Sequence, residues 1–236
     1  MAHSQTTVTE HAEAHNPALR HHFADEQQQK NAASLGMWLF LVTEIMFFGG
    51  MFCAYLVYRL AHFNAFAAAS QQLDVKMGAI NTAVLLVSSV TVVLAVKAAE
   101  AGNRKQLVSY LVVTVLLGLT FLGIKAIEYR EKFEKHHVPG PTFSFNEPFD
   151  DNGKQIPVNP NEAQLFFSLY FAMTGMHALH MIIGCGLFAV LTVLAWKGHY
   201  TSGYSTPIEN AGLYWHLVDL IWIYLFPLLY LISRHS

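Results

Sequence analysis

Five ionisable side chains lie inside long apolar runs, where each needs a hydrogen-bond or ion-pair partner or has a functional role. They are Glu44, His177, His180, His216 and Asp219. A charged group that faces lipid is costly, so such residues usually face protein, pair with one another, or handle protons and ions. The chemistry open to them is therefore proton transfer, metal ligation or hydrogen bonding between helices.

Glu44 lies about nine residues into its apolar run, within WLFLVTEIMFFGGMF. At about 1.5 Å per residue, a helix would place it near the middle of a bilayer. Two interpretations remain open at this point. Glu44 is either a proton-linked or lipid-headgroup contact, or a neutral, hydrogen-bonded carboxylic acid that locks two helices together.

The histidines and the aspartate form two pairs with a spacing of three residues. His177 and His180 share a helix face in TGMHALHMIIG, and His216 and Asp219 share one in YWHLVDLIW. The first pair could ligate a metal, but two ligands do not close a site, so hydrogen bonding to other helices is favoured. For the second pair we expect a hydrogen bond from His216 to Asp219. No metal site is predicted.

Lys125 and Glu128 are also three residues apart, near the end of an apolar run in FLGIKAIEYREKF. They either form an ion pair, or Lys125 extends its ammonium toward the membrane surface. We count Glu128 among the lipid- or proton-linked positions. Cys53 and Cys185 are interpreted as small buried residues. The small-xxx-small spacing of Gly49, Gly50, Cys53 and Ala54 permits a close approach of another helix.

Composition places these residues in a membrane. The chain is 53% hydrophobic and only 13% charged, against about 25% charged residues in a soluble domain. The near-neutral net charge gives no sign of nucleic-acid binding. Apolar runs of spanning length predict an all-α, polytopic membrane protein with five transmembrane helices, since backbone polar groups in lipid must bond within the helix. The predicted spans are about 35–61, 77–99, 107–129, 164–196 and 211–233.

The remaining segments divide the chain into a tail, a membrane domain and its connections. Residues 1–34 are predicted to be a polar, histidine-containing tail without a cleavable signal peptide. Residues 35–236 form the membrane domain, with a long extramembrane loop at 130–163 that is rich in Pro, Gly, Asn and charged residues. The short basic turn at 100–106 favours an N-terminus on the inner side.

Taken in order, the motifs resemble one family. The series is WLFLVTEIMFFGGMF, INTAVLLVSS, GNRKQ and IEYREKF, followed after the long loop by TGMHALHMIIG and YWHLVDLIWIYLFPLLYLI. It is similar to subunit III of cytochrome c oxidases and related quinol oxidases, in its five-helix bacterial form. The resemblance extends from about residue 35 to residue 233.

The resemblance implies a subunit that has no catalytic centre of its own. Subunit III carries no heme or copper, which belong to partner subunits. It packs beside catalytic subunit I, in a complex that includes subunit II, and a cleft between its two groups of helices holds phospholipid. Glu44 matches the family's carbodiimide-reactive glutamate, which is associated with bound lipid and sustained proton uptake. His177, His180, His216 and Asp219 match structural and lipid-cleft positions. The family's longer members have two additional helices at the start.

These features lead to a specific expectation. The chain is expected to be a non-catalytic subunit of a cytochrome c oxidase, active in aerobic electron transport and proton pumping. Its place would be the bacterial inner membrane, with the N-terminus cytoplasmic and the C-terminus outside. It lacks the closely spaced cysteines of a dinuclear copper site and the roughly six histidines of a heme-copper core.

Other functions remain open from the sequence. Two alternatives are related proteins: a quinol oxidase subunit III and a homologue associated with nitric oxide reduction. A more distant alternative is an ion or metal transporter that uses the intramembrane Glu, His and Asp residues as a midplane site, although no internal repeat is found. A membrane enzyme with an HxxH metal site is disfavoured, because further ligands are lacking on that helix.

Overall fold

Five long helices and one short helix make up the described part of the chain. The computed structural model describes residues 23–141, 143–145, 158–200 and 205–232. The five long helices are each long and apolar enough to cross a membrane. The prediction of an all-α bundle with five membrane-spanning helices is therefore confirmed. In chain order the helices are α1 (Glu26–Ala61), α2 (Phe63–Ser70), α3 (Val75–Glu100), α4 (Arg104–Glu134), α5 (Pro160–Trp196) and α6 (Thr206–Tyr230).

Polar N-caps extend several helices beyond the apolar runs from which the helices were predicted. α1 begins at Glu26 rather than near residue 35, because the Asp25 carboxylate accepts a hydrogen bond from the Gln28 N–H at 2.6 Å. Asp74 and Asn103 cap α3 and α4 in the same way. Residues 26–34, predicted as tail, are thus helical. Residues 1–22, with the remaining histidines of that tail, lie outside the described residues.

The connections between the helices are also shorter than predicted. α4 continues to Glu134 and α5 begins at Pro160, so both helices take residues from the predicted loop 130–163. Residues 142 and 146–157 of that loop lie outside the described part. The segment between the first two predicted spans contains α2, in which Phe66 is completely buried.

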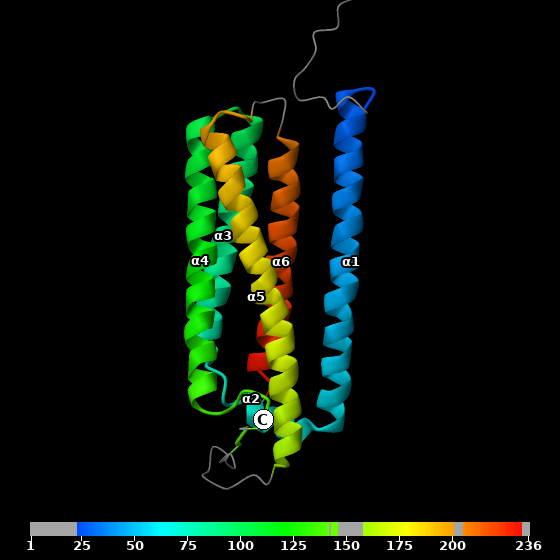
Figure 1. Cartoon of the computed structure of the whole chain (residues 1–236), viewed down its shortest axis with the longest axis vertical. Helices are drawn as coiled ribbons and strands as arrows, with labels where there is room; N and C mark the ends of the chain where they lie inside the picture. Colours follow the sequence, from blue (N-terminus) through cyan, green and yellow to red (C-terminus); the bar gives the residue numbers. More distant parts are fainter. Residues whose placement is uncertain (1–22, 142, 146–157, 201–204, 233–236) are drawn as a thin grey trace, which may run out of the picture.

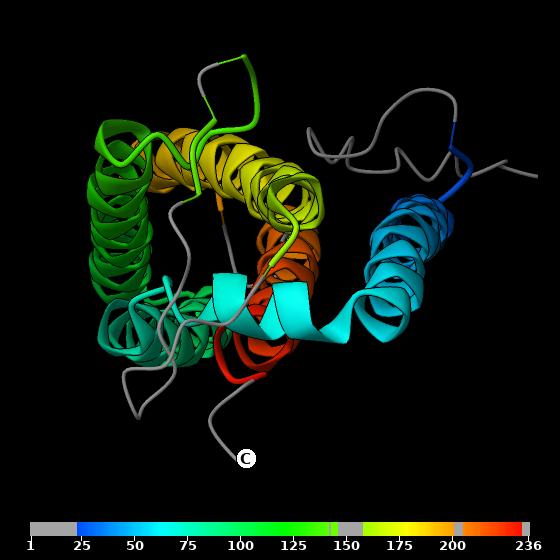
Figure 2. The ribbon, with the colours of Figure 1, turned by 90° about the horizontal axis from the view of Figure 1, so that it is seen from below.

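α3, α4, α5 and α6 pack into one group of four helices, and α1 stands beside it (Figure 1). α2 lies across one end of the molecule and leads from α1 to α3 (Figure 2). The starts of α1, α4 and α6 and the ends of α3 and α5 therefore lie together at the opposite end.

α1 contacts the rest of the chain through a narrow stripe. Its buried residues are Leu41, Phe48 and Tyr55, each seven positions apart and so on one helix face. Tyr55 donates a hydrogen bond to the Leu228 carbonyl at 2.8 Å, which ties the end of α1 to α6. Most other apolar side chains of α1 are exposed, as expected for a helix with lipid or a partner on its remaining faces.

The small residues of α1 do not pack against another helix of the described chain. A Cβ atom added at Gly49 or Gly50 would meet no heavy atom within 4 Å, so no helix of the described chain approaches there. Cys53 is exposed rather than buried. The close approach occurs instead at Gly118 of α4, where a Cβ would come within 2.6 Å of the Cys185 Sγ atom. Cys185 is buried, as predicted.

His137 follows the end of α4, outside the membrane-spanning segments. Its ring stacks on Phe167 at a centroid distance of 5.0 Å, and its Nδ1 atom has no hydrogen-bond partner among the described residues. Burial lowers the pKa of this imidazole from 6.5 to about 4, and the positive charges of Lys132 and Lys135 add to the effect. The ring is therefore neutral in the folded chain at neutral pH.

This neutral histidine predicts an acid-sensitive contact. A depressed histidine pKa gives stability that is complete above the unfolded value and is lost as pH falls from about 6.5 toward about 4. Lowering the pH from 8 to 5 should therefore cost about 2 kcal/mol. The check is the thermal unfolding midpoint of the wild type and of His137→Phe, which keeps the stacking but cannot titrate. Equal pH dependence of both proteins would exclude His137 as the cause.

Candidate functional site

Glu44 and His180 meet between α1 and α5, at mid-height of the molecule. The His180 Nε2 atom lies 3.0 Å from the Glu44 Oε2 atom. Glu44 stands at the middle of α1, and His180 stands near the middle of α5. Their side chains keep 18% and 13% of their surface exposed, respectively, so the pair is accessible from the surroundings of α1.

The hydrogen bonds of His180 indicate which of its ring nitrogens carries a hydrogen. Its Nδ1 atom lies 2.8 Å from the Met176 carbonyl oxygen, which can only accept, so Nδ1 carries a hydrogen. Nε2 then either accepts a hydrogen bond from a neutral Glu44 or, as part of an imidazolium, donates one to the carboxylate. In either form a hydrogen bond joins the carboxyl group of α1 to the imidazole of α5.

Aromatic rings hold this pair in place. The Phe48 ring lies edge-on to the His180 ring at a centroid distance of 5.3 Å. Tyr214 of α6 donates a hydrogen bond to the His180 backbone carbonyl at 2.9 Å. α1, α5 and α6 therefore meet at the Glu44–His180 pair, and each contributes a side chain to it.

A second polar cluster is buried inside the four-helix group, toward the end where α2 lies. The Lys125 Nζ atom lies 2.9 Å from the Glu128 Oε2 atom, and the two residues are 2% and 0% exposed, respectively. Tyr170 and Tyr230 donate hydrogen bonds to the other carboxylate oxygen at 2.8 and 2.6 Å. Of the two alternatives for Lys125, the structure shows the ion pair.

Four aromatic rings surround the Lys125 ammonium. Its nitrogen lies 4.9 to 5.6 Å from the ring centroids, a distance at which the electron-rich faces attract a cation. The rings belong to Tyr129, Tyr170, Trp222 and Tyr230. Because they come from α4, α5 and α6, the single charge of Lys125 joins three helices. The carboxylate of Glu128 is its counter-ion and is closed to lipid.

His177 and His180 have different surroundings and do not form a common site. His177 is fully buried between the rings of Phe121 and Trp222, at centroid distances of 5.4 and 5.2 Å. Neither of its ring nitrogens has a hydrogen-bond partner among the described residues. The two histidines thus have different partners. In the described part of the chain, no group of three His, Cys, Asp or Glu residues is placed to hold a metal ion.

The expected bond between His216 and Asp219 does not form. The His216 Nδ1 atom lies 2.8 Å from the Ser89 hydroxyl of α3 instead. Asp219 is 4% exposed, and neither of its carboxyl oxygens has a hydrogen-bond partner among the described residues. The antiparallel packing of α3 and α6 brings Ser89 opposite His216, which the spacing within α6 alone does not reveal.

Removing the Ser89 hydroxyl should therefore unpair His216. Ser89→Ala is expected to destabilise the chain by about 1–2 kcal/mol, because a partly buried imidazole loses its partner. Thr120→Ala is the matched control, since the Thr120 hydroxyl is exposed and bonds only the Leu116 carbonyl of its own helix. Thermal unfolding of both variants checks this. Equal midpoints for the two variants would contradict the expected role of Ser89.

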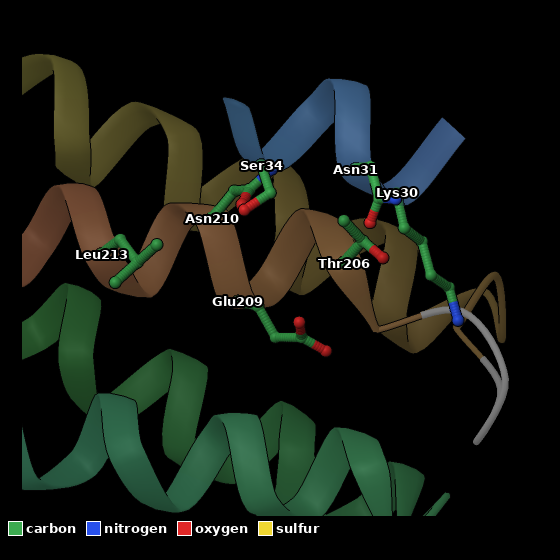
Figure 3. Close-up of a pocket in the computed structure, with 7 residues that line it drawn as sticks. All are labelled: Lys30, Asn31, Ser34, Thr206, Glu209, Asn210 and Leu213. Atoms are coloured by element: carbon green, nitrogen blue, oxygen red, sulfur yellow. The ribbon is translucent and has the colours of Figure 1, made fainter. Parts of the chain in front are cut away.

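A polar pocket lies between the first turns of α1 and α6 (Figure 3). Its volume is about 220 Å³. The lining residues are Lys30, Asn31, Ser34, Thr206, Glu209, Asn210 and Leu213. Ser34 precedes Glu44 by ten residues, or about 15 Å along the helix axis. The pocket at one end of α1 and the Glu44–His180 pair at its middle are thus about 15 Å apart along the same helix.

Comparison with known proteins agrees with this architecture. The family model of cytochrome c oxidase subunit III matches residues 20–144 and 162–234. The chain belongs to the cytochrome c oxidase subunit III family. Cytochrome c oxidase subunit 3 of Gallus gallus is 33% identical over 201 residues, which cover 83% of this chain and 67% of the relative. The corresponding protein of Coturnix japonica is 32% identical with the same coverage. Cytochrome bo(3) ubiquinol oxidase subunit 3 of Pseudomonas aeruginosa is 30% identical over 223 residues, 94% of each chain.

Several residues that build the sites of this subunit III chain were not predicted. Tyr170 and Tyr230 complete the Lys125–Glu128 cluster, and Lys132 donates to the Gln72 carbonyl while only 1% exposed. Lys132 continues the stripe of Lys125 and Glu128 at i+7, which is a signal available in the sequence. The tyrosines carry no such signal, because a tyrosine in an apolar run looks like ordinary packing.

Proposed function

We propose that this chain is subunit III of a heme-copper terminal oxidase and carries no redox centre of its own. It packs against the catalytic subunit I and supports proton uptake by that subunit. Within this chain, the Glu44–His180 pair is the site that links bound lipid to that role. The observation that carries the proposal is the 3.0 Å contact between the two side chains, which places a hydrogen-bonded carboxyl group in a partly accessible position. The buried Lys125–Glu128 cluster stabilises the four-helix group. Glu128 is closed to lipid in this arrangement.

The surroundings of α1 support a lipid as the occupant beside this pair. Its exposed side chains include Ile45 at 55%, Met46 at 72% and Phe47 at 44%, which flank Glu44 along the chain. Acyl chains are the natural cover for such a surface in a membrane. The polar pocket at the start of α1 offers Lys30 and the Ser34 hydroxyl at headgroup level. We propose the N-terminus on the cytoplasmic side of a bacterial inner membrane.

For the electron donor we propose cytochrome c, accepted by another subunit of the complex. A quinol is the second candidate, and one observation favours it. This chain and the bo(3) ubiquinol oxidase subunit 3 of Pseudomonas aeruginosa match over 94% of each length, whereas the match covers 67% of the avian cytochrome c oxidase subunits. The chain therefore matches this quinol oxidase subunit over nearly the whole length of both proteins.

Purification through a tag on this chain tests the proposal. An optical spectrum should show heme that belongs to co-purifying membrane subunits, and oxygen consumption with reduced cytochrome c or with a quinol then identifies the donor. A double variant, Glu44→Gln with His180→Leu, should keep the spectrum and the initial rate but lose activity sooner during turnover. A colourless protein that purifies alone would reject the oxidase assignment. Unaltered turnover of the variant would reject the role of the pair only.

A further inference from the structure

A second pocket lies on the far side of the four-helix group from α1. It is formed where α4 begins and α5 ends, and its volume is about 400 Å³. The lining residues are Arg104, Lys105, Val108 and Trp196. In Figure 1, α4 is the helix most distant from α1. This pocket therefore shares no residue with the Glu44–His180 pair or with the pocket between α1 and α6.

The pocket contains two cations that have no carboxylate partner in the described part of the chain. Among the described residues, no carboxylate forms a salt bridge with Arg104 or Lys105. The Arg104 guanidinium lies over the turn after α5, where a Cβ at Gly198 would stand 3.6 Å from it. This places the cation above the end of α5, beside Trp196. Two unpaired positive charges at one concave spot favour an anionic ligand.

The lower part of the pocket is apolar and continues into the membrane. Trp196, the last residue of α5, is 70% exposed, a position where tryptophan marks the membrane interface. Val112 follows Val108 by one turn on the same face of α4 and is 41% exposed, and Val193 lies one turn before Trp196 and is 47% exposed. An exposed apolar track thus leads from the cations along both helices.

We propose that this pocket binds one anionic phospholipid. Arg104 and Lys105 hold the headgroup phosphate, the Trp196 ring covers the glycerol region, and an acyl chain lies along Val108 and Val112. A basic pocket between membrane helices above an apolar track is the arrangement that recognises anionic headgroups. A free phosphate would need only the cations, and an acidic protein partner would leave the track exposed to lipid.

Lipid binding to the purified oxidase complex tests this proposal. The complex is delipidated in mild detergent and titrated with dioctanoyl phosphatidylglycerol, and bound lipid is counted by native mass spectrometry. Arg104→Gln with Lys105→Gln should weaken binding of one phosphatidylglycerol per complex by about thirty-fold. Binding of dioctanoyl phosphatidylcholine should remain the same. Lys76→Gln with Lys97→Gln is the control, since it removes two exposed charges elsewhere.

Each other outcome overturns the proposal. Equal losses in the two double variants would mean that only overall charge matters. Displacement of the lipid by millimolar inorganic phosphate, with Trp196→Ala binding as well as the wild type, would make the pocket a site for free phosphate. Loss of a protein subunit from the Arg104 and Lys105 variant, without loss of lipid, would make this face a protein interface.

Discussion

Lys125→Met is expected to lower the stability of this subunit by about 3–5 kcal/mol, because it leaves the Glu128 carboxylate buried without its counter-ion. Glu128 is 0% exposed, and no other cation among the described residues forms a salt bridge with it. The four rings around the ammonium lose their cation at the same time. The measurement is the thermal unfolding midpoint of the purified complex, together with the yield of intact complex.

A double substitution separates charge from packing. Lys125→Met with Glu128→Gln should recover most of the loss, because a buried ion pair is often replaced by neutral groups at little cost. The glutamine oxygen still accepts the hydrogen bonds of Tyr170 and Tyr230. Lys97→Met, which removes an exposed lysine of α3, should change nothing. If the double variant were as unstable as Lys125→Met alone, the pairing of charges would not be what stabilises this cluster.

Labelling by a hydrophobic carbodiimide should distinguish Glu44 from Glu128 by at least tenfold. The reagent reacts with carboxyl groups that it can reach, and the Glu44 carboxyl group is partly exposed and hydrogen-bonded to His180. Glu128 is enclosed and paired with Lys125. Peptide mass spectrometry of the labelled chain should therefore place the adduct on Glu44.

Conservative variants complete this test. Glu44→Gln should abolish labelling and leave the complex assembled, since glutamine keeps the size of the side chain and can still hydrogen-bond to His180. Glu128→Gln should label as strongly as the wild type. An adduct on Glu128 would show that the buried cluster opens to lipid and would contradict the enclosure described above.

The sequence determined the number of spans and the local pairs. Five apolar runs become five helices because lipid leaves the backbone no other partners. Lys125 and Glu128 pair because residues three apart share a helix face. The helix ends were less predictable, because hydropathy shows only which residues lie in the hydrocarbon layer of the membrane. The start of α1 is set instead by the polar cap at Asp25.

Only the tertiary structure decided which distant residues meet. Glu44 and His180 are 136 residues apart, and the Ser89 partner of His216 is 127 residues away. Same-helix spacing predicted a bond from His216 to Asp219, and the packing of α3 against α6 gave His216 another partner. For His180 a hydrogen bond to another helix was expected, and the packing of α1 against α5 decided that its partner is Glu44. The physical reason is that spacing along one helix fixes only the face on which a side chain lies. The rotation and height of the neighbouring helix select its partner.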